Sequence, residues 1–146
     1  MAVKFNLQSV LNYRQSLEDQ ARQVLAISQQ LRVRQESELH QHRDALKKYD
    51  QELKLRQREG LSVAEMDVYE AKIYHCRQKM MQLKQQLKQL AQRIDKECKA
   101  LQQAARDRQI MEKLKDKQSA EYHQELSRKE RVMLDEISLR NKGERS

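Results

Sequence analysis

A single glycine interrupts a chain that otherwise has the character of continuous helix. Gly60 is the only glycine before Gly143, and the 146 residues include no proline. Glycine adopts the left-handed conformation without a Cβ penalty, and many helices end in that way. Ser62 follows as an N-cap, with Glu65 three residues later as its capping-box partner. Gly60, Leu61, Ser62 and Glu65 therefore predict a turn that closes one helix and opens the next.

A turn this short makes the two helices antiparallel neighbours. We expect helices at about 6–58 and 63–141, joined by a turn at 59–62, with Asn6 as the first N-cap. Asn141 and Gly143 are expected to end the second helix. The predicted fold class is all-α: an antiparallel two-helix coiled-coil hairpin with a longer, overhanging second helix, forming one domain over residues 1–146.

The composition allows either a coiled coil or disorder. Charged residues make up 36% of the chain and aromatic residues 4%. Such a composition is typical of long helices when the apolar residues are periodic, and of disorder when they are not. The periodicity of the apolar residues favours helix.

The first helix is predicted to bury one face. Its apolar spacing of three and four runs through Leu7, Val10, Leu17, Ala21, Val24, Ser28 and Leu31, widened by Leu11 and Leu25. The next steps, through Gln35 to Leu39, are four and four, which is typical of a stutter that locally unwinds the supercoil. The spacing then resumes through His42, Leu46, Tyr49 and Leu53.

The second helix has the more regular pattern. Its predicted seam comprises Met66, Tyr69, Ile73, Cys76, Met80, Leu83, Leu87, Leu90 and Ile94, then Leu101, Ala104 and Met111. In the hairpin, residues whose numbers total about 121 should face one another. Beyond about residue 116 the second helix should then overhang while still carrying apolar residues, which indicates either a partner or a frayed end.

The charge and the cysteines restrict the class of protein. The net charge is +8, and residues 71–94 contain Lys72, Arg77, Lys79, Lys84, Lys88 and Arg93 but no acid. This run is either an ordinary solvated face or a stripe that binds nucleic acid. Cys76 and Cys98 lie roughly 33 Å apart on one helix, too far for a disulfide. There is no apolar run of signal or membrane-span length, so we expect a soluble, cytoplasmic protein.

No catalytic constellation is present in the sequence. Two glycines cannot build a phosphate loop or a nucleophile elbow. His42 and Cys76 should face each other, but two ligands do not make a zinc site. We therefore expect no enzyme activity, no cofactor and no metal, and a chain that is monomeric in isolation.

Three patterns in order along the chain resemble the FliJ family of flagellar type III export proteins. The first is Phe5-x-Leu7-x-x-Val10-Leu11-x-x-Arg14 with Glu18, and the second is Tyr49, then Gly60-Leu61-Ser62, then Tyr69 with Ile73. The third and most specific runs from Met111 to Lys117 as MEKLKDK, then Glu130, then Leu134-Asp135-Glu136. The length and basic character are also similar to that family.

The resemblance implies a role as a non-enzymatic stalk. FliJ-like proteins are antiparallel coiled coils whose terminal end enters a hexameric export ATPase and promotes its assembly and activity. They also contact the cytoplasmic domain of the export gate and receive substrate chaperones. The location implied is the cytoplasm, peripheral to the inner membrane at the flagellar basal body.

The same resemblance suggests which residues contact each partner. It marks Leu11, Arg14, Glu130, Leu134, Asp135 and Glu136 as candidates for the ATPase ring, and Tyr49, Tyr69 and Ile73 as candidates for the export gate. From the residues alone, Tyr49 and Tyr69 could instead pack on each other, and Arg14 could fix the register.

Three other interpretations stay open at this point. The chain could be the related stalk protein of a virulence-type secretion system, or a basic coiled-coil arm that binds nucleic acid. It could also be a structural dimer of open, continuous helices. The capped turn argues against the dimer, because a continuous helix would not place Gly60 in its interior.

Overall fold

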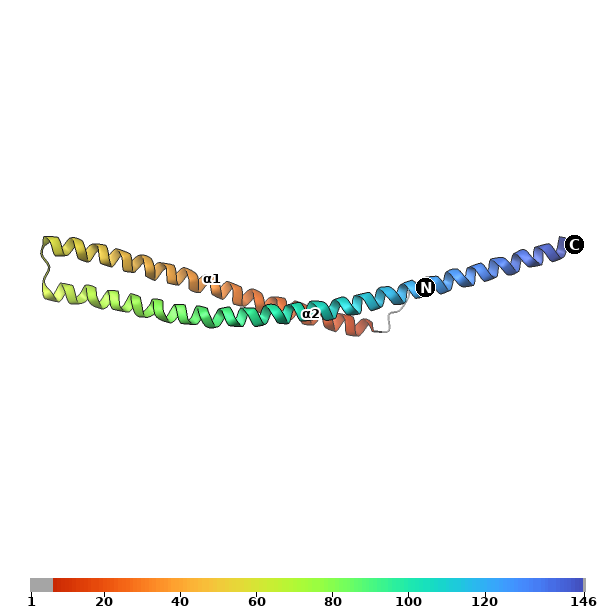
Figure 1. Ribbon diagram of the computed structural model, residues 1–146, viewed down its shortest axis with the longest axis horizontal. Coiled ribbons are helices and arrows are strands. Elements are labelled where there is room, and N and C mark those ends of the chain that lie inside the picture. The colour runs from red at the N-terminus through yellow and green to blue at the C-terminus, as the bar shows by residue number, and fades with distance from the viewer. Residues whose placement is uncertain (1–6, 146) are drawn as a thin grey trace. The chain divides into compact units, whose positions relative to one another are not determined.

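Two long helices make up the fold. The computed structural model describes residues 7–145, and within them it contains α1 (Gln8–Glu59) and α2 (Val63–Arg145) (Figure 1). The described residues form no strand. The two helices pack against each other, so the predicted all-α helical hairpin is confirmed. The expected N-cap Asn6 lies outside the described residues, and the first described helical bond joins the Leu11 amide to the Leu7 carbonyl.

The turn has the conformation that its residues favour. Gly60 has a φ of 101°, and no other described residue has a positive φ. The Ser62 hydroxyl accepts a hydrogen bond from the Glu65 amide at 3.2 Å, and the Ser62 carbonyl accepts one from Met66 at 3.0 Å. The Glu65 carboxylate, which a capping box would direct to the Ser62 backbone, instead lies 3.6 Å from Nη1 of Arg56 in an exposed ion pair between the helices.

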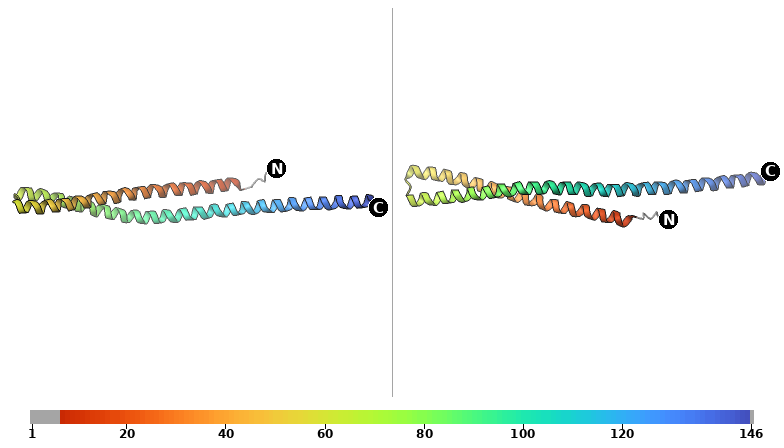
Figure 2. Two further views of the ribbon diagram at one scale, coloured as in Figure 1. Left: turned by 90° about the horizontal axis from the view of Figure 1, so that it is seen from above. Right: turned by 60° about the horizontal axis from the view of Figure 1, so that its bottom comes forward.

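The chain divides into two compact units, each described here by itself. One is Ala21–Leu101, which contains the turn, and the other joins the described residues up to Gln20 with those from Gln102 onward. In the first unit the helices leave the turn antiparallel (Figures 1 and 2). Its buried apolar side chains all belong to α2 and recur at steps of three, four and seven: Ile73, Cys76, Leu83, Leu90 and Ile94. This is the predicted seam of the second helix.

The register within Ala21–Leu101 follows the predicted pairing. Leu31 and Gln35 of α1 line one groove together with Gln86 and Leu90 of α2, so residues whose numbers total about 121 lie opposite one another. The ion pair between Arg56 and Glu65 has the same register. The short loop at Gly60 sets this register, because a connection of so few residues leaves the two antiparallel helices little freedom to slide along each other.

The seam of α1 differs from the prediction in its phase. Val24, which was assigned to the seam, is 46% exposed, whereas Leu11 and Glu18 are buried and Leu25 is half-buried. These three positions are one heptad apart, and the same phase resumes at the half-buried residues Leu39, Leu46 and Leu53. Between these two stretches burial follows the predicted steps of four and four: Leu31, Gln35 and Leu39 are half-buried, whereas Arg32 is exposed. The apolar residues at 10, 17 and 24 gave a misleading phase because the true seam position at 18 is a charged residue.

In the other unit, residues 8–20 of α1 pack on the neighbouring part of α2. Leu11 is the one apolar side chain that is buried among the described residues of this unit, at 3% exposure. All described side chains from 123 to 143 are exposed, as the predicted overhang requires. Helix α2 continues to Arg145, so the expectation that Asn141 and Gly143 end it was wrong. Neither residue adopts the left-handed conformation that would stop the helix.

Candidate functional site

Charged side chains fill the contact between α1 and α2 in the terminal unit. Glu18 is 6% exposed, and its carboxylate accepts a hydrogen bond from Nε of Arg108. Nη1 of Arg108 lies 2.8 Å from a carboxylate oxygen of Glu112 on the next turn. Both Glu18 and Arg108 occupy positions where a coiled coil ordinarily places apolar residues. Each of these charges is met by an opposite one, so neither is left without compensation in the seam.

A second ion pair lies beside the first. Arg14 donates to Asp107 at 3.3 Å, and Asp107 also accepts from the Gln103 amide at 3.0 Å. The hydrogen bond from Arg108 to Glu112, followed by the one to Glu18, raises the pKa of the Arg108 guanidinium above its ordinary value. Arg108 therefore stays charged at every physiological pH, and the network holds residues 8–20 of α1 on α2.

The six residues predicted to contact an ATPase ring fall into two groups. Leu11 is buried, and Arg14 is half-buried in its pair with Asp107. The other four, Glu130, Leu134, Asp135 and Glu136, are all exposed on the last part of α2. The structure does not bring the groups together, because the 23 residues from Asp107 to Glu130 span roughly 35 Å of helix.

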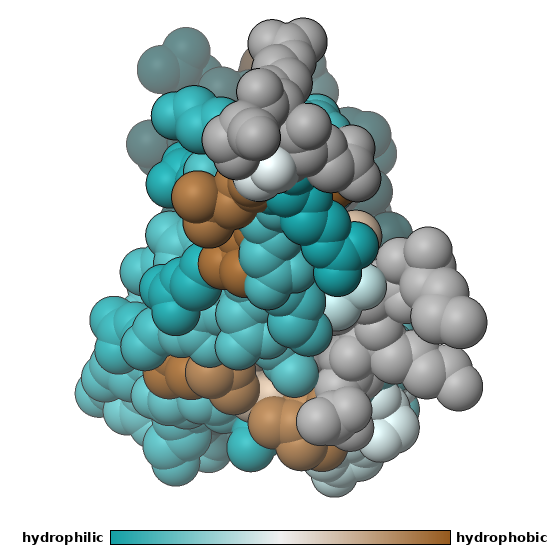
Figure 3. Space-filling model, turned by 90° about the vertical axis from the view of Figure 1, so that its right-hand side faces the viewer, coloured by the Kyte–Doolittle hydropathy of each residue, from teal (hydrophilic) through white to brown (hydrophobic). Residues whose placement is uncertain are grey.

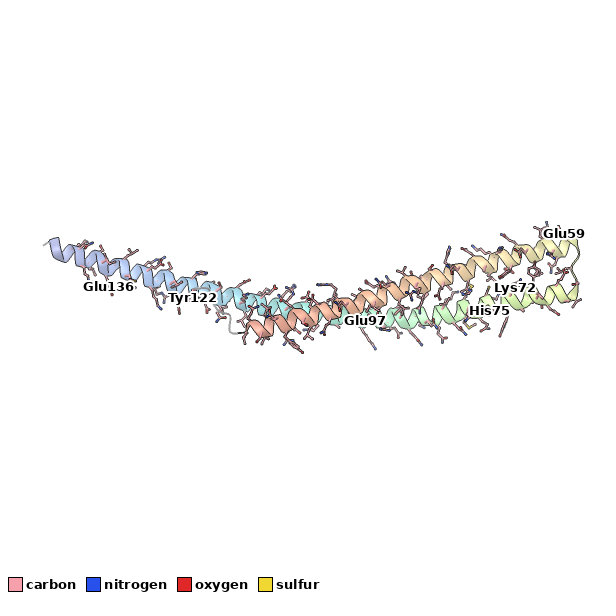
Figure 4. All side chains as sticks on the ribbon, turned by 180° about the vertical axis from the view of Figure 1, so that it is seen from behind. Glu59, Lys72, His75, Glu97, Tyr122 and Glu136 are labelled. Atoms are coloured by element: carbon pink, nitrogen blue, oxygen red, sulfur yellow. The ribbon has the colours of Figure 1, made fainter. Side chains whose placement is uncertain are left out.

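The last part of α2 exposes apolar side chains that nothing in its unit covers. The exposed fractions are 52% for Val132, 62% for Met133, 65% for Leu134, 50% for Ile137 and 69% for Leu139. Tyr122 and Glu136 mark this part of the helix in Figure 4. The face drawn in Figure 3 is mostly hydrophilic and carries separate hydrophobic patches. A helix with apolar residues on view and no packed neighbour is typical of an element that binds a partner.

The two tyrosines predicted to contact an export gate both lie close to one lysine. Lys72 is labelled in Figure 4. Its Nζ lies 5.5 Å from the ring centroid of Tyr49 on α1 and 5.7 Å from that of Tyr69 on α2. Both distances are within the range of a cation–π contact. Both tyrosines are half-buried, whereas Ile73 is buried in the seam at 9% exposure. Lys72 therefore contacts one tyrosine ring from each helix. The two tyrosines take part in the contact between the helices and also keep part of their surface exposed.

Sequence reasoning missed three participants in these contacts. Arg108 and Asp107 were given no role, and Lys72 was considered only as part of the basic run in residues 71–94. The available signal was the heptad spacing from Leu11 to Glu18 to Leu25, which places a carboxylate in the seam and so requires a cation opposite. The position of that cation could be found only from the register.

The described part of the chain contains no cluster of metal ligands and no membrane-spanning stretch. No group of three or more potential metal ligands is found among its His, Cys, Asp and Glu side chains. Neither helix, within the residues searched, contains a stretch that is long and apolar enough to span a bilayer. Cys76 is buried and Cys98 half-buried, and both are free thiols.

A family comparison assigns the chain. The model of the flagellar FliJ protein family matches residues 3–145. The chain belongs to the FliJ family. Comparisons with curated proteins and with solved structures returned no match. Membership in the FliJ family gives the chain a structural part in flagellum biogenesis and its protein export.

Proposed function

We propose that the protein is a non-enzymatic stalk of the flagellar export apparatus and acts as one coiled-coil domain. Its partners are the hexameric export ATPase, the cytoplasmic domain of the export gate and the chaperones that bring substrates. It works in the cytoplasm, peripheral to the inner membrane at the basal body. It carries no cofactor, binds no nucleic acid and is monomeric when isolated. The match to a flagellar family favours this role over that of a virulence-type stalk.

The observation that supports this proposal is that the last part of α2 has no packed neighbour in its unit. Exposed apolar side chains from Val132 to Leu139 alternate there with the exposed charges Asp135 and Glu136. A ring of subunits around a single helix would bury these side chains from several directions at once. Because one helix cannot match a six-fold ring symmetrically, the subunits would be held unequally, and unequal contacts shift them toward different nucleotide states.

The ring contact is tested by the ATP hydrolysis rate of the purified export ATPase, titrated with this protein at physiological salt. We expect a saturable rise in rate. The triple variant Leu134→Ala, Asp135→Ala, Glu136→Ala should lose most of that rise. A matched control is Asp67→Ala, Val68→Ala, Glu70→Ala, which changes the same kinds of exposed side chain near the turn.

Truncation after Lys117 sharpens the test. It removes the bare part of α2 and leaves residues 8–20 with their ion-pair partners up to Glu112. Full stimulation by the truncated protein, or equal losses in the two triple variants, would exclude the last part of α2 as the ring contact.

We assign the gate contact to Tyr49, Tyr69 and Ile73 near the turn. The Lys72 ammonium shared by the two rings supports this assignment, because it holds aromatic surface from both helices at one place. Replacing Tyr49 and Tyr69 by leucine should weaken binding to the purified gate domain while leaving ATPase stimulation intact. Unchanged affinity for the gate domain would move its contact elsewhere.

A further inference from the structure

The seam within the Ala21–Leu101 unit has two flanks that differ in their charges. On one flank opposite charges meet, because Arg56 of α1 pairs with Glu65 of α2. Lys72, one heptad after Glu65, lies on that flank with its two tyrosine contacts. The other flank contains a groove of about 290 Å³, which is lined by Leu46 of α1 and by Arg77, Met80, Met81 and Lys84 of α2.

Four charged side chains occupy the flank that contains this groove. They are Arg43 and Asp50 on α1 and Glu70 and Arg77 on α2, and each directly follows a buried or half-buried residue of the seam. On two antiparallel helices, residues that share this heptad position face each other across one side of the seam. Arg77 lies roughly 140° around α2 from Lys72, so this side is the one away from the tyrosine contacts.

The register brings like charges together on this flank. Facing residues have numbers that total about 121, so Arg43 lies opposite Arg77, and Asp50 lies opposite Glu70. Within the described residues none of these four side chains forms an ion pair, although Asp50 is half-buried. Like charges that face each other oppose the pairing of α1 with α2. The hairpin itself gains nothing from this arrangement.

The like-charged pairs are confined to a short stretch of the flank. One heptad further from the turn, Glu36 of α1 faces Lys84 of α2 and also lies 3.9 Å from Arg32, so opposite charges meet there again. The stretch with like charges lies beside the groove that contains Leu46 and the 61% exposed Met81. Apolar surface and two uncompensated charge pairs of opposite sign thus occur together within about two heptads of each helix.

Charge complementarity on this flank selects one kind of neighbour. We propose that the flank docks an amphipathic helix of another protein, which places an apolar side chain in the groove, an acidic side chain at Arg43 and Arg77, and a basic side chain at Asp50 and Glu70. The acid and the base of that helix are one heptad apart, because the two pairs are. A second copy of this chain is disfavoured as the occupant, because two chains of net charge +8 repel each other along their whole length.

A single charge reversal tests whether the two arginines face each other. Arg77→Glu turns the pair with Arg43 into an opposite pair, so the melting temperature of the full chain should rise by about 1–4 °C. The matched control is Lys79→Glu, which reverses an exposed cation one heptad after Lys72, on the other flank. A rise for Arg77→Glu no larger than that for Lys79→Glu would overturn the proposal.

Docking is tested with a synthetic helix of about 21 residues, which has one leucine in each heptad and two glutamates placed one heptad from two lysines. Titration of the full chain, followed by fluorescence anisotropy of the peptide, should saturate below about 1 mM. Arg43→Glu with Arg77→Glu should weaken binding by on the order of tenfold, because the acidic side of the peptide is then repelled. A peptide with lysine in place of both glutamates should bind this double variant more tightly than it binds the unaltered chain.

The double variant is expected to keep its helices, because both altered side chains are exposed and one like-charged pair replaces another. Circular dichroism checks this. Binding that does not saturate, or that Lys79→Glu weakens as much as the double variant does, would overturn the proposal. A dimer of the unaltered chain in sedimentation that the double variant abolishes would make a second copy the occupant and would overturn it as well. The inference is independent of the ring contact, because Arg77→Glu should stimulate the export ATPase normally.

Discussion

Single residues decide the properties of the seam in the terminal unit. Glu18 and Arg108 occupy positions where leucines would pack, and their charges compensate each other. Such pairs add little net stability compared with apolar residues of similar size, yet removing one partner is costly because the other charge is left without compensation. Their contribution is to the register of α1 on α2.

Substitution of this pair should separate those two effects. Glu18→Leu alone should lower the melting temperature by several degrees, because Arg108 then retains only Glu112. Glu18→Leu with Arg108→Leu should restore it or raise it. Thermal denaturation followed by circular dichroism measures both. A double variant that melts below Glu18→Leu would mean that the pair supplies net stability.

The pH dependence follows from the raised pKa of Arg108. A raised pKa adds stability that is present below the ordinary arginine value and is lost only as the pH rises through the raised value. The difference in melting temperature between the unaltered chain and Glu18→Leu should therefore stay constant from pH 7 to about pH 10. A difference that shrinks over this interval would contradict a charged, paired Arg108.

The two glycines should respond in opposite ways to alanine. At Gly60 a Cβ meets no atom within 4 Å, so the cost of Gly60→Ala is the left-handed backbone alone, about 1–2 kcal/mol. Gly143 is helical and its Cβ also meets nothing, so Gly143→Ala should add helicity worth about 0.5–1 kcal/mol locally. Denaturant unfolding and helical ellipticity measure the two effects. If both variants changed stability by the same amount and in the same direction, Gly60 would not be in the turn.

Residues 8–20 and residues 21–101 differ in the interactions that hold their helices together. Residues 21–101 contain five of the buried apolar side chains, whereas residues 8–20 contribute only Leu11. In residues 8–20, Val10 and Leu17 are half-buried, and Arg14 and Glu18 form ion pairs with α2. Apolar burial is little affected by moderate salt, but ion pairs near the surface are screened. The start of α1 should therefore be the part of the paired region that opens most easily.

Hydrogen exchange can test this difference between segments. Amides in residues 11–20 should exchange faster than those in residues 76–94, and the gap should widen between 0.05 M and 1 M salt on the scale set by the Debye length. Amides in residues 123–143 should exchange fastest, since a helix without packed neighbours gains little from propensity alone. Protection of residues 123–143 equal to that of the seam would reveal an undetected partner, such as a second copy.

At the scale of the whole molecule, α1 and α2 bury apolar side chains against each other, while the last part of α2 stays exposed. The chain as a whole is basic, with a net charge of +8. Charge of one sign opposes self-association and favours acidic partners. Isolated protein should accordingly have the mass of one chain, 17.5 kDa, in sedimentation equilibrium at physiological salt. A stable dimer whose dissociation leaves no helix would contradict the hairpin.

The sequence alone was sufficient for the fold class, the turn at Gly60 to Ser62 and the seam of α2 from Met66 to Ile94. These depend on local conformational preference and on an apolar repeat that no charged residue interrupts. The phase of α1 needed the tertiary structure. In the sequence, the apolar residues at 10, 17 and 24 suggest one line of seam positions, and residues 11, 18 and 25 suggest another. Only the packing of α1 on α2 shows that Glu18 is buried in the second line and paired with Arg108. The position of Lys72 against one tyrosine of each helix was also decided in three dimensions, since it depends on which faces of the two helices meet.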